Sequence, residues 1–513
     1  MQNQSSPITG GTLALATLGL ALATFMQVLD TTIANVSIPA IAGDLGVSPT
    51  QGTWVITSFA VSNAIAVPLT GWLARRFGEV KLFTIATLLF TLASWGCGLA
   101  NSLPMLLAFR VLQGLVAGPM IPLSQSLLLA IYPPARKGVA LALWSMTTLV
   151  APIVGPILGG WITDNISWPW IFYINIPVGV IAAYFTYSVL KSRETQIARA
   201  PIDFIGLALL VMAVGSLQLM LDQGRELDWF NSSVIVGLAV VAVIAFFFLI
   251  AWELTEAHPV IDLHLFQRRN FTVGAIAISL GYGVFFGNVV LMPLWLQTQM
   301  GYTATWAGLA VAPMGVLAVL LSPWVGKNLQ RFDLRSLATV SFVVFAITAF
   351  LRGRFTTSVD FNHIASIQVL QGIATAFFFV PLVSIVLSGL PPQRIASASG
   401  LSNFLRITAG SFGASLTTTL WDRREALHQS HLVVSINPYD QTSNMVLDQL
   451  RSLGLNDAES YATLMRTVVG QAYMLATDDF FWISGWLFLS LCIVVWFAKP
   501  PFGHTGGAAA AAD

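Results

Sequence analysis

The chain has 513 residues, of which 56% are hydrophobic and only 9% are charged. Soluble proteins carry about a quarter charged residues, so this composition excludes an ordinary soluble protein and predicts a membrane protein. The formal net charge of +1 also argues against nucleic acid as a partner, because nucleic-acid binders gather many Lys and Arg side chains on one face.

Apolar segments long enough to cross a membrane recur along the whole chain. A helix needs about 20 apolar residues to span the hydrocarbon core. The N-terminal segment lacks the basic region and cleavage site of a signal peptide, so we expect the first span to be retained. Fourteen membrane helices are predicted, at 14–39, 52–74, 82–100, 104–131, 138–162, 169–190, 203–221, 233–253, 271–298, 304–326, 334–351, 363–389, 396–420 and 480–498.

The loops between these spans alternate in charge. Connections after even-numbered spans, and the tail, hold most basic residues, whereas the short loops on the other side hold only Arg225, Arg352 and Arg354. Because cytoplasmic loops are enriched in Lys and Arg, we expect both termini in the cytoplasm and segment 421–479 outside. Within that segment Asn456 and Glu459 predict a capping box that opens a helix. The segment is either a solvated lid or a docking surface.

A long internal repeat divides the chain. The sequence RVLQGLVAG, beginning at Arg110, returns as QVLQGIATA from Gln368, and Trp54 aligns with Trp306. The repeat relates helices that run in the same direction, as in the major facilitator fold. We therefore predict an all-α membrane protein with two parallel six-helix halves, 1–200 and 261–513, and two inserted helices in 201–260.

An acidic residue stands inside the first predicted span. Asp30 lies in the run FMQVLDTTIANVSIP, with no basic residue nearby in sequence. A charge at a helix centre costs roughly 2.5 to 3.5 kcal/mol, so an intramembrane acid suggests a function. Burial and a nearby cation act oppositely on its protonation, so Asp30 can exchange a proton as water access changes. The alternative is a permanent ion that only holds Arg110 in place.

Arg110 is the cation expected to tune Asp30. Its guanidinium stays charged and offers a planar fork of donors, although a structural clamp between helices is the alternative. The repeat has Gln368 at the corresponding position, so only one half carries this charge. We predict that the first half handles the proton and that the second, with Gln368 and Gln371, contributes more to substrate accommodation.

Two glycine-rich stretches are candidate gates. The fifth span contains APIVGPILGG, in which small residues allow close helix packing and a proline bends the helix. The loop after the second span, GWLARRFGEVKLF, is a basic turn between two helices. Ordinary tight packing and a simple cytoplasmic loop are the alternatives. The candidate gate residues are Gly71, Arg76, Gly78, Gly155, Pro156 and Gly159.

Polar and aromatic residues scattered through the predicted spans suggest an amphipathic cavity. Apolar walls with a few hydrogen-bonding groups suit drug-like or fatty molecules better than sugars or ions. Lipid-facing or packing roles are the alternative for each aromatic residue. The candidate cavity residues are Gln27, Asn35, Trp54, Gln113, Trp144, Tyr282, Asn288, Gln371, Asn403 and Arg406.

The energy source is inferred from missing motifs. No G-x-x-x-x-G-K-[ST] phosphate loop occurs in the sequence, which argues against ATP hydrolysis. The six histidines and two cysteines have no spacing that suggests a metal site. We expect no enzyme activity, no cofactor and no metal, and a proton gradient as the driving force.

Several of these motifs resemble one transporter family. LDTTIANVSIP at 29–39 is similar to the first-span signature of the fourteen-span drug:proton antiporters of the major facilitator superfamily, and WPWIFYINIPVG at 168–179 to their sixth-span entry. The stretches 71–81, 110–118 and 151–160 resemble three further family motifs. One departure is Arg75, which stands where the family's loop motif has an aspartate. The resemblance covers nearly the whole chain.

The resemblance implies an exporter. It implies that Asp30 takes part in proton coupling, that Arg110 influences its protonation, and that Gly155 and Pro156 belong to the antiport helix. It also implies a bacterial inner-membrane location within a tripartite efflux system, with a periplasmic adaptor and an outer-membrane channel as partners. A proton-coupled importer and a non-transporting membrane receptor are the alternatives.

Overall fold

The chain folds as a bundle of long helices in a computed structural model that describes residues 10–197, 201, 203–434, 436 and 440–502. Every regular element in these ranges is helical. The first-half helices are α1 (Gly10–Ile33), α2 (Ile38–Asp44), α3 (Pro49–Gly52), α4 (Trp54–Ala66), α5 (Thr70–Phe77), α6 (Glu79–Gly98), α7 (Leu103–Ala117), α8 (Met120–Ile131), α9 (Lys137–Asn165), α10 (Trp170–Tyr173) and α11 (Asn175–Leu190). Segment 201–260 holds α12 (Phe204–Gln223) and α13 (Ser233–Thr255).

The second half is built from fewer and longer helices. Its helices are α14 (Arg269–Thr298), α15 (Ala304–Val311), α16 (Pro313–Asn328), α17 (Leu334–Arg352), α18 (Phe361–Val386), α19 (Pro392–Val434), α20 (Gln441–Ser452) and α21 (Asp457–Val495). Six short 3-10 helices connect elements, among them η1 (Asn35–Ser37) and η2 (Val67–Leu69). Continuous helices satisfy every backbone hydrogen bond internally, as a chain inside lipid requires.

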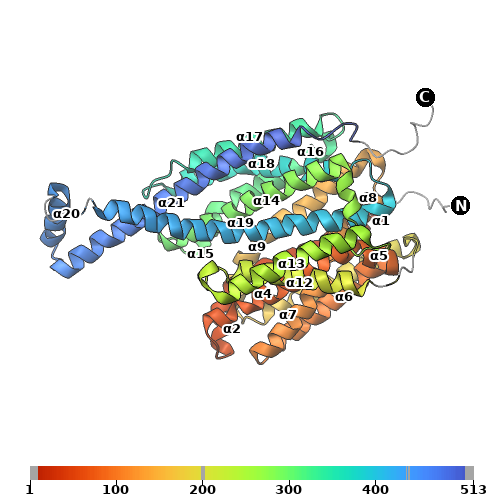
Figure 1. Cartoon of the computed structure of the whole chain (residues 1–513), viewed down its shortest axis with the longest axis horizontal. Coiled ribbons are helices and arrows are strands. Elements are labelled where there is room, and N and C mark those ends of the chain that lie inside the picture. The colour runs from red at the N-terminus through yellow and green to blue at the C-terminus, as the bar shows by residue number, and fades with distance from the viewer. Residues whose placement is uncertain (1–9, 198–200, 202, 435, 437–439, 503–513) are drawn as a thin grey trace.

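Most of the predicted spans are present as long apolar helices. Among the described residues, twelve helices are long and apolar enough to cross a membrane, and a bent pair, Pro134–Pro152 with Ile157–Asn165, raises the number to thirteen. The remaining predicted span, 396–420, lies in α19, which runs through the bundle (Figure 1) but is not among these helices. Ser, Thr and Asn side chains and Arg406 make it more polar. The all-α class is confirmed, and the count falls just short of fourteen.

Helix packing within the first half depends on small residues. A Cβ atom added at Gly19 would lie 2.8 Å from Thr186 Oγ1, and one at Gly159 would lie 2.6 Å from the Ile33 carbonyl oxygen. Glycine at these positions therefore lets α1 approach α11 on one side and α9 on the other. The helix that carries Asp30, α1, therefore packs closely against both α11 and α9.

Two long helices project from the bundle as a hairpin. The C-terminal part of α19, α20 and the N-terminal part of α21 extend beyond the other helices, at the end opposite the start of α1 (Figure 1). The predicted capping box is present, since the side chains of Asn456 and Glu459 each accept from the other's backbone N–H at 2.9 Å. The helix predicted to open at Asn456 and the last predicted span, 480–498, belong to one helix, because α21 begins at Asp457 and continues without a break.

Polar contacts join the two stems of this hairpin near the bundle. Asp479 on α21 pairs with Arg424 at 2.9 Å and with His428 at 2.7 Å, both on α19. Asp422 pairs with Arg225, which follows α12, at 2.9 Å. The hairpin is thereby tied both to itself and to the inserted helices.

The two halves meet tightly at the end where α1 starts and α21 ends. Gly138 of α9 and Gly326 of α16 are so close that a Cβ atom on either would collide with the backbone of the other. Gly71 of α5 similarly faces Ser397 at the start of α19. These glycines close the bundle at this end.

Candidate functional site

Asp30 lies at the centre of a buried polar network in the first half. Its side chain is fully buried. Its Oδ2 accepts a hydrogen bond from Arg110 Nη1 at 2.5 Å, and its Oδ1 accepts from Gln113 Nε2 at 3.0 Å and Asn175 Nδ2 at 2.9 Å. Three helices, α7, α11 and α1, supply these groups. The carboxylate therefore accepts three hydrogen bonds, one of them from a cation.

Arg110 is held from several sides. Its Nε donates to the Val55 carbonyl oxygen at 3.0 Å, and its Nη1 also donates to Gln113 Oε1 at 2.7 Å. Its guanidinium carbon lies 4.3 Å from the centre of the Phe59 ring, which adds a cation–π contact. Breaking a buried pair of this kind by removing one partner leaves an uncompensated charge, which costs about 3 to 5 kcal/mol. The Asp30–Arg110 pair is consequently sensitive to any change in charge.

Sequence reasoning missed part of this network. Asn175, at the start of α11, also donates to Ser94 Oγ at 2.9 Å, and Ser94 donates to the Phe172 carbonyl oxygen at 3.0 Å. The available signal was the asparagine within the apolar run FYINIP. Gln113, predicted for the substrate cavity, instead bonds to Asp30. A hydrogen-bond partner on a distant helix cannot be read from spacing alone.

The predicted gate residues of the loop lie at the end of the bundle where Gly71 faces Ser397 of the second half. Gly78 has a φ of 87° and connects α5 to α6, and a Cβ atom there would collide with Glu194. The Glu194 carboxylate accepts from the backbone N–H groups of Val80 at 3.0 Å and Lys81 at 2.8 Å, so it caps α6. Arg76 lies over the Trp72 ring at 5.7 Å. The loop is thus held rigidly at the end of the first half.

Arg75, where the family motif has an aspartate, makes a contact between the halves. Its Nη1 donates to Ser397 Oγ at 3.1 Å. Ser397 is also the residue that faces Gly71. At this position the chain therefore joins its halves through an arginine and a serine, without the acid of the general motif.

The predicted gate residues of the fifth span face α1. A Cβ atom at Gly155 would collide with Thr32, and Gly159 lies against Ile33. Pro156 lies within α9, but its side chain falls outside the described residues. Because Thr32 and Ile33 lie two and three residues after Asp30, the glycines of α9 contact the same turn of α1 that carries the acid.

Gln368, the repeat counterpart of Arg110, also has an arginine as its partner. Arg352 Nη2 donates to Gln368 Oε1 at 2.8 Å, and the Arg352 side chain is buried. The interpretation of Arg352 as a loop residue is wrong, because it forms the last turn of α17. The second half therefore carries a buried cation next to Gln368 on a different helix, α17.

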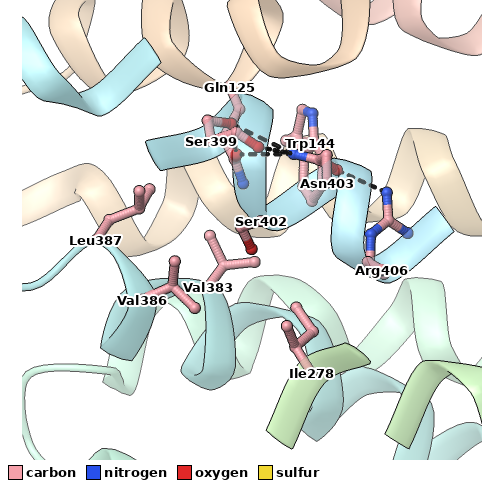
Figure 2. Close-up of a pocket in the computed structure, with 10 residues that line it drawn as sticks. All are labelled: Gln125, Trp144, Ile278, Val383, Val386, Leu387, Ser399, Ser402, Asn403 and Arg406. Carbon is pink, nitrogen blue, oxygen red and sulfur yellow. Dashed lines mark hydrogen bonds between the residues drawn. The ribbon is translucent and has the colours of Figure 1, made fainter. Parts of the chain in front are cut away.

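A small cavity lies between the halves near the closed end. Figure 2 shows three predicted residues there, Trp144, Asn403 and Arg406, together with Gln125 and Ser399, which sequence reasoning missed. Trp144 and Gln125 belong to the first half, and the other three belong to α19. Side chains of both halves therefore contribute to this cavity.

The other predicted cavity residues lie elsewhere. Asn35 and Trp54 are exposed on the surface of the helix bundle. Asn288 is buried, and its Nδ2 donates to the Val284 carbonyl oxygen at 2.7 Å. Gln27 and Gln371 are buried, each with a side-chain oxygen that lacks a hydrogen-bond partner. These five residues are not among those that line the cavity.

Tyr282 contributes indirectly. Its ring lies 4.7 Å from the Arg406 guanidinium carbon and makes a cation–π contact with it. Among the described residues, no group of three or more His, Cys, Asp or Glu side chains could hold a metal ion. The polar chemistry of the site is therefore that of an ion pair and an amide-rich cavity.

Comparison with known proteins identifies the family. The family model described as Major Facilitator Superfamily matches residues 20–414. The chain belongs to the major facilitator superfamily. The resemblance of its motifs is confirmed, and the family membership makes the chain a transporter and not an enzyme.

Relatives of known name match almost the whole chain. Multidrug export protein EmrB of Escherichia coli (strain K12) is 54% identical over 505 residues, which cover 98% of this chain and 99% of that protein. EmrB of Haemophilus influenzae is 56% identical, with 97% and 98% covered. Fatty acid resistance protein FarB of Neisseria gonorrhoeae is 51% identical, with 98% and 99% covered.

A solved structure supports the same fold. The proton:xylose symporter XylE superposes with a TM-score of 0.59 at 15% identity, over 94% of this chain and 95% of that one. At this identity the likeness concerns the fold alone.

Proposed function

We propose that this transporter is a proton-driven antiporter that exports amphipathic drugs or toxic hydrophobic compounds by alternating access. The observation that carries the proposal is the fully buried Asp30, paired with Arg110 at 2.5 Å inside the bundle. A proton from the outer side neutralises Asp30 and releases Arg110 from the pair, and re-pairing on the inner side expels the proton. The membrane potential supplies about 2.3 kcal/mol per charge per 100 mV.

The packing of α1 offers a route from the proton to the motion. Thr32 and Ile33 follow Asp30 and contact Gly155 and Gly159 of α9. The other end of α9 meets α16 of the second half through Gly138. A shift of α1 on protonation is therefore transmitted to α9, the helix that contacts the opposite half. This contact has to change when the two halves rock against each other.

The relatives support the direction and the cargo of transport. Two relatives above 50% identity are named multidrug export proteins and one is named a fatty acid resistance protein. We place the transporter in the bacterial inner membrane with both termini in the cytoplasm. The hairpin formed by α19, α20 and α21 would then project into the periplasm, where it can dock an adaptor that leads to an outer-membrane channel.

Reconstituted vesicles with an imposed pH gradient test the proposal. The Asp30→Asn variant should insert normally and lose uphill export of an amphipathic dye, because the amide cannot exchange a proton. A matched control is Asp222→Asn, which changes a half-buried acid of α12 that accepts from Gln218 Nε2 at 3.0 Å. Uphill transport by Asp30→Asn at the unmodified rate would refute proton coupling through Asp30.

Inverted vesicles separate the alternatives. An exporter fills inverted vesicles when the gradient is imposed, a proton-coupled importer empties them, and a receptor binds the dye without any flux. The same preparation therefore decides among all three functions.

A further inference from the structure

Arg406 differs from Arg110 in having no acidic partner. It is 5% exposed, and its Nη2 donates to Asn403 Oδ1 at 2.7 Å. Its guanidinium otherwise lies against the rings of Tyr282 at 4.7 Å and Phe379 at 5.7 Å. No carboxylate of the described residues forms an ion pair with it. Arg406 is a buried cation without a counterion at the edge of the cavity between the halves.

A second donor in the same cavity lacks a partner. Gln125 Nε2 is buried and makes no hydrogen bond within the part of the chain that the structure describes. The other end of this amide, Oε1, accepts from Ser399 Oγ and, at 3.5 Å, from Asn403 Nδ2. Because these bonds hold the oxygen end of the amide, its NH2 group is the end without a hydrogen-bond partner. The polar wall of the cavity therefore has more donors than acceptors.

The opposite wall is apolar. Figure 2 shows Ile278, Val383, Val386 and Leu387 on the side of the cavity away from Gln125 and Asn403. The cavity thus has one donor-rich wall and one hydrocarbon wall. An amphiphile with a polar head and an aliphatic tail matches both.

The charge of Arg406 favours a negatively charged acceptor in this cavity. A buried cation without a partner is costly, and the cost is recovered when a negative group binds beside it. The planar guanidinium fork suits a carboxylate, which accepts two parallel hydrogen bonds. We propose that Arg406 and the Gln125 amide form a headgroup subsite for the carboxylate of an anionic amphiphile. This assignment names a substrate class for the exporter proposed above and rests on that function.

The cavity is small in this closed conformation. Its volume is about 10 Å³, which is about enough for one water molecule. The headgroup and the tail therefore both need the space that opens as the halves separate.

Equilibrium binding to the full-length protein in lipid nanodiscs tests the subsite without any gradient. The probes are laurate and dodecyltrimethylammonium, which share a twelve-carbon chain and carry opposite charges. We expect Arg406→Gln to weaken laurate binding about tenfold or more, because the carboxylate loses its charged partner. A tenfold change in affinity corresponds to about 1.4 kcal/mol. Binding of dodecyltrimethylammonium should stay equal or improve. Arg406→Lys, which keeps the charge and loses the fork, should weaken laurate binding less.

Two further variants keep the result interpretable. Arg352→Gln removes another buried arginine of the second half, which contacts Gln368 and does not line the cavity, and it should leave laurate binding unchanged. Gln125→Met removes the amide at similar volume and should weaken laurate binding a few fold.

The outcomes separate the subsite from the proposed function. Equal loss of both probes in Arg406→Gln, or the same laurate defect in Arg352→Gln, would overturn the subsite. Selective loss of laurate binding supports it even if the unmodified protein shows no uphill transport, in which case the proposed antiport is what fails.

Discussion

In the first half Arg110 lies 2.5 Å from Asp30, whereas in the second half neither Arg352 nor Arg406 contacts a carboxylate among the described residues. The first half therefore pairs its buried cation, on α7, with a buried anion on α1. The second half holds positive charge that only aromatic rings, amide oxygens or a ligand can stabilise. The repeat kept the fold in both halves while the charges diverged, and under the proposed function this difference separates proton exchange from substrate accommodation in space.

The largest expected effect comes from breaking the complete pair. Arg110→Gln leaves Asp30 buried without a cation and should destabilise the protein by about 3 to 5 kcal/mol. The double variant Asp30→Asn with Arg110→Gln removes both charges and should recover at least part of that loss. Thermal unfolding in one detergent measures both variants. If the double variant is less stable than Arg110→Gln, the pair does not behave as a unit.

An intermediate effect is expected where the halves touch. Gly138→Val places a side chain against the backbone of Gly326, so it should hold the closed end apart and lower export about tenfold or more. The control is Gly160→Val on the same helix, where no atom lies within 4 Å of an added Cβ. Thiol labelling of a cysteine placed at Ser397 should rise in Gly138→Val only. Unchanged labelling would mean that this contact does not close the bundle.

The smallest effect should come from the second half. Arg352→Met removes a buried cation that has no acidic partner among the described residues, and the loss is limited to the hydrogen bond to Gln368 Oε1 and the cation–π contact with the Phe481 ring at 5.6 Å. A buried acceptor left without its donor costs about 1 to 3 kcal/mol, and removing the uncompensated charge offsets this loss. We expect a change in thermal stability well below that of Arg110→Gln. A loss of thermal stability as large as that of Arg110→Gln would contradict the difference between the halves.

The sequence predicted the helices and the acid more successfully than the partners of the acid. Long apolar runs identify membrane helices because lipid imposes that composition directly. Asp30 and Arg110 stood out because charges inside such runs are rare. Asn175 and Gln125 did not, since a polar residue gains its role only from neighbours on other helices.

The ends of the helices were also predicted less accurately than the helices themselves. Arg352 looked like a loop residue because the apolar run ends beside it, yet α17 continues through it. The predicted span at 480–498 covers only part of α21, because polar residues can extend a helix beyond the membrane as readily as they can end it. Where water replaces lipid, composition no longer distinguishes a helix from a loop.

The continuity of α19 and α21 has a mechanical consequence. With 43 and 39 residues, these rods are about 60 Å long at roughly 1.5 Å per residue, about twice the roughly 30 Å hydrocarbon core. Because no break separates the part inside the bundle from the part outside, the rods act as a lever. A tilt of the second half by only a few degrees would displace the far tip by several ångströms. The transport cycle would then move parts of the protein that lie well beyond the membrane surface.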